Sequence, residues 1–267
     1  MTGALRWIIT VTSLLHCTLA QAQAIDLSVR VRNAGGDVLS STKLCGFAPR
    51  ALNGVSYEWD ITGSLPIQRA GRQYCLDLPG IGPHQSRQII LKWHAQAEIR
   101  KEKSTESGRY DSLSQPSAEL MRLASSFGSY SKTERVNRIF DWMQLNIAFL
   151  GIRRDVDGAE HALRTRRGDC TEHMLLAAEL LERNGFTVRR VLGAALPKTQ
   201  FRMTANSLHN WVEYQDGGQW LIFDSSRGVL GKPDQQIYVA LHFYEDSQQL
   251  RLAPLSADQP HIKLYLQ

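Results

Sequence analysis

The chain has 267 residues, 43% of which are hydrophobic, and a formal net charge of +5. That apolar fraction is enough for a buried core in one large or two small domains. The charge is only mildly basic, and no lysine- or arginine-rich tail suggests a nucleic acid partner. An anionic envelope polymer is permitted as a partner, but the charge does not require one.

Residues 1–24 have the pattern of a secretory signal peptide. Arg6 precedes a short uncharged apolar stretch from Trp7 to Leu19, and small residues suited to cleavage follow at positions 20–24. The stretch is shorter than the ~20 residues of a typical membrane span. We therefore expect cleavage near residues 22–24, no membrane span afterwards, and a periplasmic or secreted protein; an uncleaved anchor is the alternative. Cleavage removes one of the 31 basic residues and none of the 26 acidic ones, which leaves a charge of +4.

Residues 25–100 are typical of a small all-β, sandwich-like domain. Polar and apolar residues alternate over residues 26–32, as in a half-buried strand. Glycines and prolines separate further strand-like runs at residues 55–61, 73–78 and 87–94. Cys45 and Cys75 both fall in this region, and an oxidising compartment favours a disulfide between them. Residues 101–116 are polar and are predicted to form a linker.

Residues 117–267 are predicted to form an α+β domain, because helices come first and strands follow. Ser117 can cap a helix that runs to about Phe127, and residues 131–134 form a capping box for a second helix. A third helix begins near Cys170 and ends at Gly185. The predicted strands that follow cover residues 187–192, 209–214, 219–224, 237–243 and 262–266.

Cys170 is the cysteine left over after this pairing, and its neighbours favour a reactive thiol. Asp169 can cap the helix with Glu172 reaching back, and Gly168 allows a tight approach to the helix. Cys170 then lies in the first turn, where unpaired N–H groups and the helix dipole stabilise a thiolate. Nearby positive charge comes from Arg164, Arg166 and Arg167, which together with Arg153 and Arg154 form either a solvated face or a substrate contact.

His209 and Asp224 bracket a predicted β-hairpin with glycines at its turn. A loop of two or four residues places the two side chains on the same face of the hairpin, whereas a three-residue loop separates them. We therefore predict an even-length loop, with Trp211, Trp220 and Ile222 on the face that His209 and Asp224 share. A cysteine nucleophile, a histidine base and an orienting aspartate form the arrangement that acyl transfer needs.

A metal site is the alternative interpretation of the cysteine. His161 and His173 could join Cys170, but the paired cysteine spacing of a zinc site is absent from the sequence. We expect neither a metal nor a cofactor.

The combined pattern resembles the transglutaminase-like superfamily, in its bacterial secreted branch. The resemblance covers roughly residues 130–230 and implies a papain-like α+β fold, with Cys170 as nucleophile, His209 as base and Asp224 as orienting carboxylate. Asn210 stands where alanine usually follows the histidine, and Ser225-Ser226 stands where proline-threonine usually follows the aspartate. The matching segments are 168–173, the helix ending at Gly185, the strand through Val191 and Gly193, 209–213 and 220–224.

These features predict a cysteine-dependent hydrolase or acyltransferase that works through a thioester. The expected substrate is a protein or peptide with an amide carbonyl, and hydrolysis by a peptidase or amidase is favoured over glutamine–lysine cross-linking. The rival hypothesis is an inactive scaffold protein of a cell-envelope or exopolysaccharide assembly, since fold and triad do not by themselves establish activity.

Overall fold

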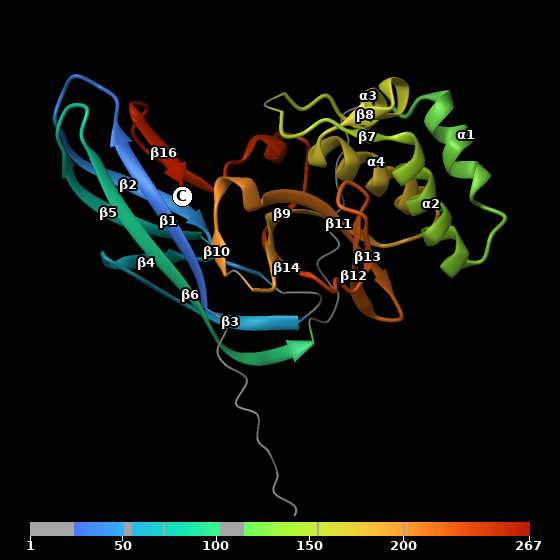
Figure 1. Ribbon diagram of the computed structural model, residues 1–267, viewed down its shortest axis with the longest axis horizontal. Helices are drawn as coiled ribbons and strands as arrows, with labels where there is room; N and C mark the ends of the chain where they lie inside the picture. The colour runs from blue at the N-terminus through green and yellow to red at the C-terminus, as the bar shows by residue number, and fades with distance from the viewer. Residues whose placement is uncertain (1–23, 51–54, 72, 102–114, 154, 200) are drawn as a thin grey trace, which may run out of the picture.

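The computed structural model describes residues 24–50, 55–71, 73–101, 115–153, 155–199 and 201–267. The predicted signal peptide lies outside the described residues, apart from Ala24, and so does most of the predicted linker. A β-sandwich and an α+β domain lie side by side, as Figure 1 shows. No helix among the described residues has the length and apolar character needed to cross a membrane.

The N-terminal region forms two sheets that pack face to face. One sheet has the strand order β10-β1-β6-β3, with β16 also paired to β1, and the other has the order β15-β2-β5-β4. Three of these strands come from later in the chain: β10 (Arg202–Met203), β15 (Leu255–Ala257) and β16 (Ile262–Leu266). Four of these strands, β2, β4, β10 and β15, were not predicted from the sequence. The six N-terminal strands are β1 (Ala24–Asn33), β2 (Leu39–Phe47), β3 (Val55–Gly63), β4 (Ile67–Ala70), β5 (Gln73–Ile81) and β6 (Ser86–Lys101).

Alternating side chains explain the sandwich. The apolar residues of β1, from Ile25 to Val31, are buried at every second position, as the sequence pattern predicts. They meet Leu44 and Leu76 from the facing sheet in one core. The predicted disulfide is confirmed: Cys45 and Cys75 lie opposite each other on β2 and β5 and are bonded.

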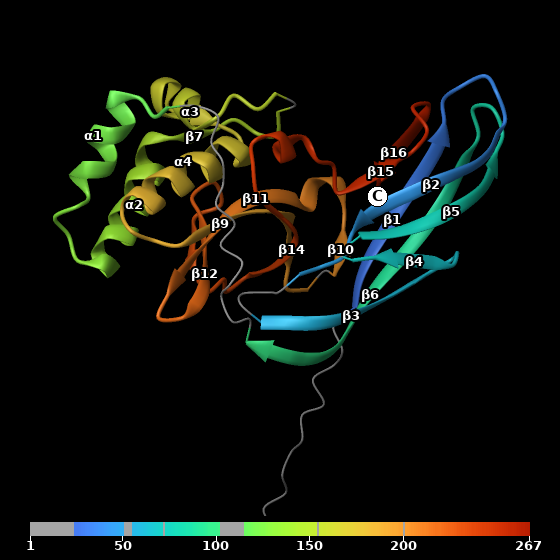
Figure 2. The same ribbon diagram turned by 180° about the vertical axis from the view of Figure 1, so that it is seen from behind.

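The α+β domain places helices over one face of a five-stranded sheet. The sheet has the order β13-β12-β11-β9-β14. Helix α4 packs on this sheet, and α1, α2 and α3 pack around α4 (Figures 1 and 2). The elements are α1 (Ala118–Ser126), α2 (Lys132–Asn146), β7 (Ala148–Phe149), α3 (Ala159–Thr165), β8 (Arg167–Gly168), α4 (Cys170–Arg183), β9 (Val188–Pro197), η1 (Ala205–Ser207), β11 (Leu208–Asp216), β12 (Gln219–Asp224), β13 (Val229–Gly231), β14 (Gln236–Tyr244) and η2 (Gln248–Arg251).

The predicted helix signals are confirmed. Ser117 accepts a hydrogen bond from Leu120 N at the start of α1, and Ser131 forms its capping box at the start of α2. The apolar stripe of α2 is buried against the other helices through Val136, Ile139 and Met143. The α+β class is likewise confirmed, although the short α3 was not predicted.

The chain returns to the sandwich after the five-stranded sheet. Strands β15 (Leu255–Ala257) and β16 (Ile262–Leu266) pair with β2 and β1, and the short β10 (Arg202–Met203) adds to β1 in parallel. The sequence predicts one domain over residues 117–267 and another over residues 25–100. The structure instead places the last two strands in the sandwich sheets, and apolar residues of β9 and β14 share the core of the sandwich. The two units therefore meet across a continuous apolar core.

Candidate active site

Helix α4 begins at Cys170, as predicted. Asp169 accepts a hydrogen bond from Thr171 N at 2.7 Å, and Glu172 accepts from Asp169 N at 3.1 Å, which completes a capping box. A side chain at position 168 would collide with Glu172, because a Cβ built there lies 2.5 Å from Glu172 Cβ. Within the described residues no group accepts a hydrogen bond from the Cys170 N–H. This N–H is thus available at the positive end of the helix.

The environment of the Cys170 thiol differs from the prediction. The residue is only 7% exposed. Burial raises the pKa of the thiol to about 12, and the carboxylate of Asp169 acts in the same direction. The backbone N–H of Asn210, which follows His209, opposes this effect. The sequence predicted a stabilised thiolate from the helix dipole and the arginines, whereas burial disfavours the charged form of the thiol and raises its pKa.

The hairpin that carries His209 and Asp224 has an even-length loop, as predicted. Asp216 pairs with Gln219, so the loop consists of Gly217 and Gly218, and both have positive φ angles of 54° and 76°. A two-residue turn with this backbone matches the twist of the flanking strands. The two catalytic candidates are consequently diagonal neighbours on one face of the sheet.

His209 and Asp224 form a buried pair. His209 Nε2 lies 2.6 Å from Asp224 Oδ2, and the two side chains are 4% and 1% exposed. This bond leaves His209 Nδ1 as the nitrogen that can accept a proton from another group. Trp211 stacks beside the imidazole, with the ring centroids 6.4 Å apart. Trp211 and Ile222 belong to one buried cluster on this face, and Trp220 is buried too.

Asp224 is held as a carboxylate by four donors. Tyr238 donates to Oδ2 at 2.8 Å, while Ser226 Oγ and Arg227 N donate to Oδ1 at 2.7 and 3.1 Å. Burial acts to raise the pKa of Asp224, but the hydrogen bond and charge of His209, with the Ser226 and Tyr238 hydroxyls, hold it below its ordinary value of 3.8. Asp224 can therefore orient the imidazole and stabilise its cation.

Two further contacts tie α4 to the strands. Asn210 Nδ2 donates to Thr171 Oγ1 at 2.9 Å, and Tyr244 Oη donates to Asn210 Oδ1 at 3.1 Å. His173 Nδ1 lies 2.8 Å from Ser225 Oγ, which joins the cysteine helix to the end of β12. These bonds fix the spacing between the element that carries Cys170 and those that carry His209 and Asp224.

Comparison with known proteins shows which family this region resembles. Residues 122–225, which contain Cys170, His209 and Asp224, match the model of the transglutaminase-like superfamily. Residues 122–225 thus form a transglutaminase-like domain, which takes up about two fifths of the chain. A search of the curated proteins finds no match.

Three solved structures are similar to this chain, and the first of them shares its fold. A candidate cysteine protease from Cytophaga hutchinsonii is 14% identical, with a TM-score of 0.51 over 91% of this chain and 90% of that chain. The periplasmic domain of TgpA from Pseudomonas aeruginosa is 15% identical, with a TM-score of 0.39 over 76% of this chain and 88% of that chain. A candidate protease from Parabacteroides distasonis is 16% identical, with a TM-score of 0.37 over 74% of this chain and 43% of that chain. The first likeness extends through both the sandwich and the transglutaminase-like domain.

The two departures from the transglutaminase-like pattern have structural roles. Asn210, in place of the usual alanine, forms the link between Thr171 and Tyr244. Ser225 and Ser226, in place of proline-threonine, contact His173 and Asp224. Both departures therefore add hydrogen bonds around the triad positions.

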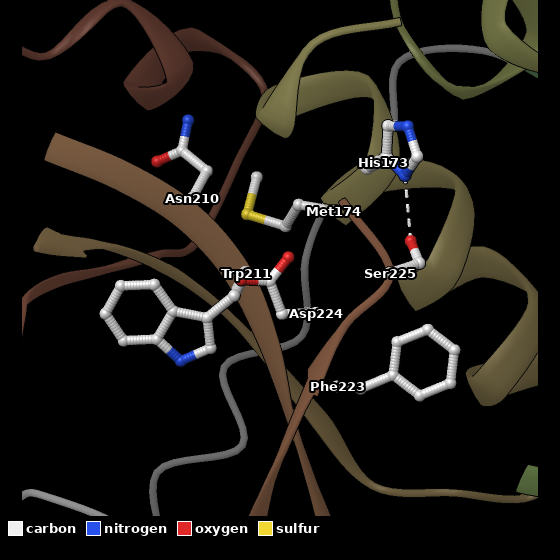
Figure 3. A pocket seen from close by; sticks show the side chains of 7 residues that line it. All are labelled: His173, Met174, Asn210, Trp211, Phe223, Asp224 and Ser225. Atoms are coloured by element: carbon white, nitrogen blue, oxygen red, sulfur yellow. Dashed lines mark hydrogen bonds between the residues drawn. The ribbon is translucent and has the colours of Figure 1, made fainter. Parts of the chain in front are cut away.

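A narrow crevice lies at the transglutaminase-like site. It has no room for a water molecule, and Figure 3 shows its lining residues. The bond between His173 and Ser225 lies on the side of the crevice away from Trp211. Burial lowers the pKa of His173 to about 4, so this second histidine is neutral at pH 7. The lining residues are His173, Met174, Asn210, Trp211, Phe223, Asp224 and Ser225.

The arginines and histidines near Cys170 have other partners. Arg153 pairs with Asp157 at 3.0 Å, and Arg166 pairs with Glu119 at 3.0 Å. His161 Nε2 lies 3.6 Å from Asp157 and is partly exposed. Among the residues that the structure describes, no group of three or more metal-ligating side chains could hold a metal ion.

Sequence reasoning missed Tyr238 and Tyr244. Both come from β14, which is not adjacent in sequence to any of the predicted site segments, and each hydroxyl binds a side chain at the site. Gln144 of α2, whose side chain donates to the Ser225 carbonyl, was missed as well. A tyrosine in a strand ordinarily indicates packing, so only the folded arrangement reveals these contacts.

Proposed function

We propose that the protein is a periplasmic or secreted cysteine acyl-transfer enzyme that acts on an amide carbonyl of a peptide or protein. The single observation that carries the proposal is the buried bond between His209 Nε2 and Asp224 Oδ2, beside the helix that begins at Cys170. The match of residues 122–225 to the transglutaminase-like superfamily supports it. The disulfide supports an oxidising compartment, because such bonds persist mainly outside the cytoplasm.

The proposed reaction has two stages. His209 Nδ1 accepts the thiol proton as Cys170 Sγ attacks the carbonyl carbon, which gives a tetrahedral oxyanion. The Cys170 N–H, which has no acceptor among the described residues, is positioned as an oxyanion donor. His209 then protonates the leaving amine as the carbon–nitrogen bond breaks, and a thioester remains. Attack by water releases a carboxylic acid and the thiol, whereas attack by an amine forms a new amide.

The sequence favours hydrolysis over cross-linking, and hydrolysis is the outcome that we propose.

Asp224 serves both stages, because its charge stabilises the imidazolium that forms when His209 holds a proton. Its four donors keep it ionised and immobile. It is thus a positioning carboxylate that need not exchange a proton with the substrate.

One observation favours a second candidate, a non-catalytic scaffold. Cys170 is almost fully buried, and burial raises the pKa of its thiol to about 12. A thiol in that state is a weak nucleophile at neutral pH. An enzyme requires that the His209 imidazolium stabilise the Cys170 thiolate enough to offset the effect of burial on the thiol pKa. A scaffold has no need of a thiolate.

The rate of Cys170 alkylation by iodoacetamide, measured against pH, separates the two functions. For the enzyme we expect the rate to titrate below the ordinary thiol value of about 8.5 and to fall in His209→Ala. The matched control is His261→Ala, an exposed histidine beside β16, which should leave the profile unchanged. A slow rate that rises only at high pH and is indifferent to His209 would favour the scaffold.

A further inference from the structure

We infer that an apolar strip beside the nucleophile, formed by Phe149, Leu150, Ile152 and Val156, is the docking surface for apolar side chains of a polypeptide acyl donor. This inference rests on the proposed function, because it names the substrate class of the same site. The strip comprises β7 and the segment that follows it. The segment that leads from α2 to the cysteine helix thereby becomes a determinant of substrate choice.

The first observation is the concentration of exposed apolar side chains. Phe149, Leu150, Ile152 and Val156 are 49%, 46%, 68% and 37% exposed. Elsewhere among the described residues, large apolar side chains with such exposure occur singly along the chain, for example Val38, Ile90 and Leu252. Single exposed apolar residues are ordinary, whereas a contiguous group indicates a surface that another molecule covers.

The second observation is that the backbone of the strip is held against both sides of Cys170. Leu150 N donates to Gly168 O at 2.9 Å, and Arg153 N donates to Asp169 Oδ2 at 3.0 Å. Asp157 N donates to Glu172 Oε1 at 2.9 Å. These three acceptors belong to residues two before, one before and two after the nucleophile. The strip therefore lies close to any carbonyl that reaches Cys170.

The third observation concerns the charges of the segment. Arg153 Nη1 and Asp157 Oδ2 are 3.0 Å apart, and His161 is also close to Asp157. Since these charges are paired with one another, apolar surface is the main chemistry that the described residues of the segment present. Asp155 is exposed and disfavours an acidic side chain in the same place. A substrate with an apolar residue beside the reactive carbonyl therefore suits the apolar strip and the nearby Asp155. A substrate with an aspartate in that place does not.

A polypeptide is the occupant that these observations favour. The residues on either side of a scissile amide must pass over the elements that flank the nucleophile, and here those elements carry the strip. Burial of one apolar side chain against such a surface corresponds to roughly a tenfold gain in apparent affinity. The strip is thus continuous with the proposed site and requires no separate ligand.

Three irreversible probes test the inference through the rate of Cys170 labelling. They are the chloromethyl ketones of acetyl-Leu-Gly, acetyl-Gly-Gly and acetyl-Asp-Gly, each of which alkylates Sγ with loss of chloride. We expect the leucine probe to label the wild type roughly tenfold faster than the aspartate probe. In Ile152→Ser and Val156→Ser this preference should fall several-fold. The matched control is Ile90→Ser, a comparably exposed position on β6, which should keep the wild-type preference.

The alternatives give different results. Equal labelling by the three probes, or a leucine preference that survives both strip substitutions, overturns the inference. Strip variants that dissociate a dimer in sedimentation but keep the probe preference overturn it in favour of a contact between two copies. Slow iodoacetamide labelling that is indifferent to His209, with slow labelling by every probe, defeats the proposed function and the inference together. His209-dependent iodoacetamide labelling with no probe preference defeats the inference alone.

Discussion

The sandwich and the transglutaminase-like domain bury very different side chains. In the described part of the sandwich, the buried polar residues are Asn33 and Thr42, and the core is otherwise apolar. The transglutaminase-like domain buries many ionisable side chains: Asp169, Glu172, His173, Arg189, Arg190, His209, Glu213 and Asp224. Because burial of a charge is costly unless it is paired, a domain that buries so many must satisfy each of them with partners.

The difference shows that buried ion pairs, and not only apolar contacts, hold the transglutaminase-like domain together. The ion pair between Arg189 and Glu213 is 2.6 Å long and almost fully buried, and Arg189 also lies over Trp220. Similar pairing holds Asp224 with His209. The sandwich instead relies on alternating apolar strands and one disulfide. We expect the two regions to respond differently to substitution, and four experiments test this contrast.

The largest effect should come from Asp224→Asn. The amide cannot stabilise the imidazolium as a carboxylate does and favours the wrong tautomer, so we expect acyl transfer to fall by roughly 10⁴-fold. The rate of amide turnover measures this, with iodoacetamide labelling of Cys170 as a second readout. The matched control is Asp216→Asn at the exposed end of the same hairpin. Equal losses in the two variants would contradict a catalytic role.

Removal of the disulfide should have the next largest effect, and on stability alone. Cys45 and Cys75 are separated by 30 residues, and opening a loop of that length costs about 3.5 kcal/mol in the chain-entropy model. Chemical denaturation of Cys45→Ala/Cys75→Ala should show this loss in the free energy of unfolding. The folded double variant should label Cys170 at the wild-type rate. A loss of labelling would show that the two regions are not separable.

The buried His173 should make stability depend on pH. Burial lowers its pKa to about 4 from the ordinary 6.5, so between these values the unfolded chain binds a proton that the folded chain does not. Stability from this group is complete above pH 6.5 and is lost as the pH falls towards 4, by up to about 3 kcal/mol.

The free energy of unfolding of His173→Gln, compared with wild type at pH 7 and pH 4.5, checks this sign. We expect the variant to lose less stability on acidification than the wild type. The same change at the exposed His261 in the sandwich should not alter the slope. An unchanged slope in His173→Gln would assign the acid sensitivity to the buried carboxylates instead.

The smallest effect should come from Asn210→Ala, which restores the residue usual in the superfamily. The change removes the bonds to Thr171 and Tyr244 and should cost about 1–2 kcal/mol of stability. Thermal unfolding measures it. Because the backbone N–H that faces the thiol remains, the pH profile of Cys170 labelling should keep its midpoint. A shifted midpoint would show that the side chain itself controls the thiol.

Local sequence signals were enough to predict the helix and the hairpin that carry the site residues. The capping pattern of Asp169 and Glu172 placed Cys170 at the start of a helix, because N-terminal capping depends on residues only three apart. The loop-parity argument placed His209 and Asp224 on one face, since side chains alternate along a strand. The pairing of Cys45 with Cys75 needed only the compartment and their shared β-rich region.

Only the tertiary structure decided the electrostatics and the boundaries. The raised pKa of Cys170 and the low pKa of His173 come from burial, which depends on residues distant in the chain. The Tyr238 hydroxyl reaches Asp224 only because β14 packs beside β9 in the same sheet. The return of β15 and β16 to the sandwich has no local signal, because strand pairing is set by long-range contacts rather than by neighbouring residues. The sequence by itself thus determined which residues could react, and the fold determined the protonation states and partners with which they do so.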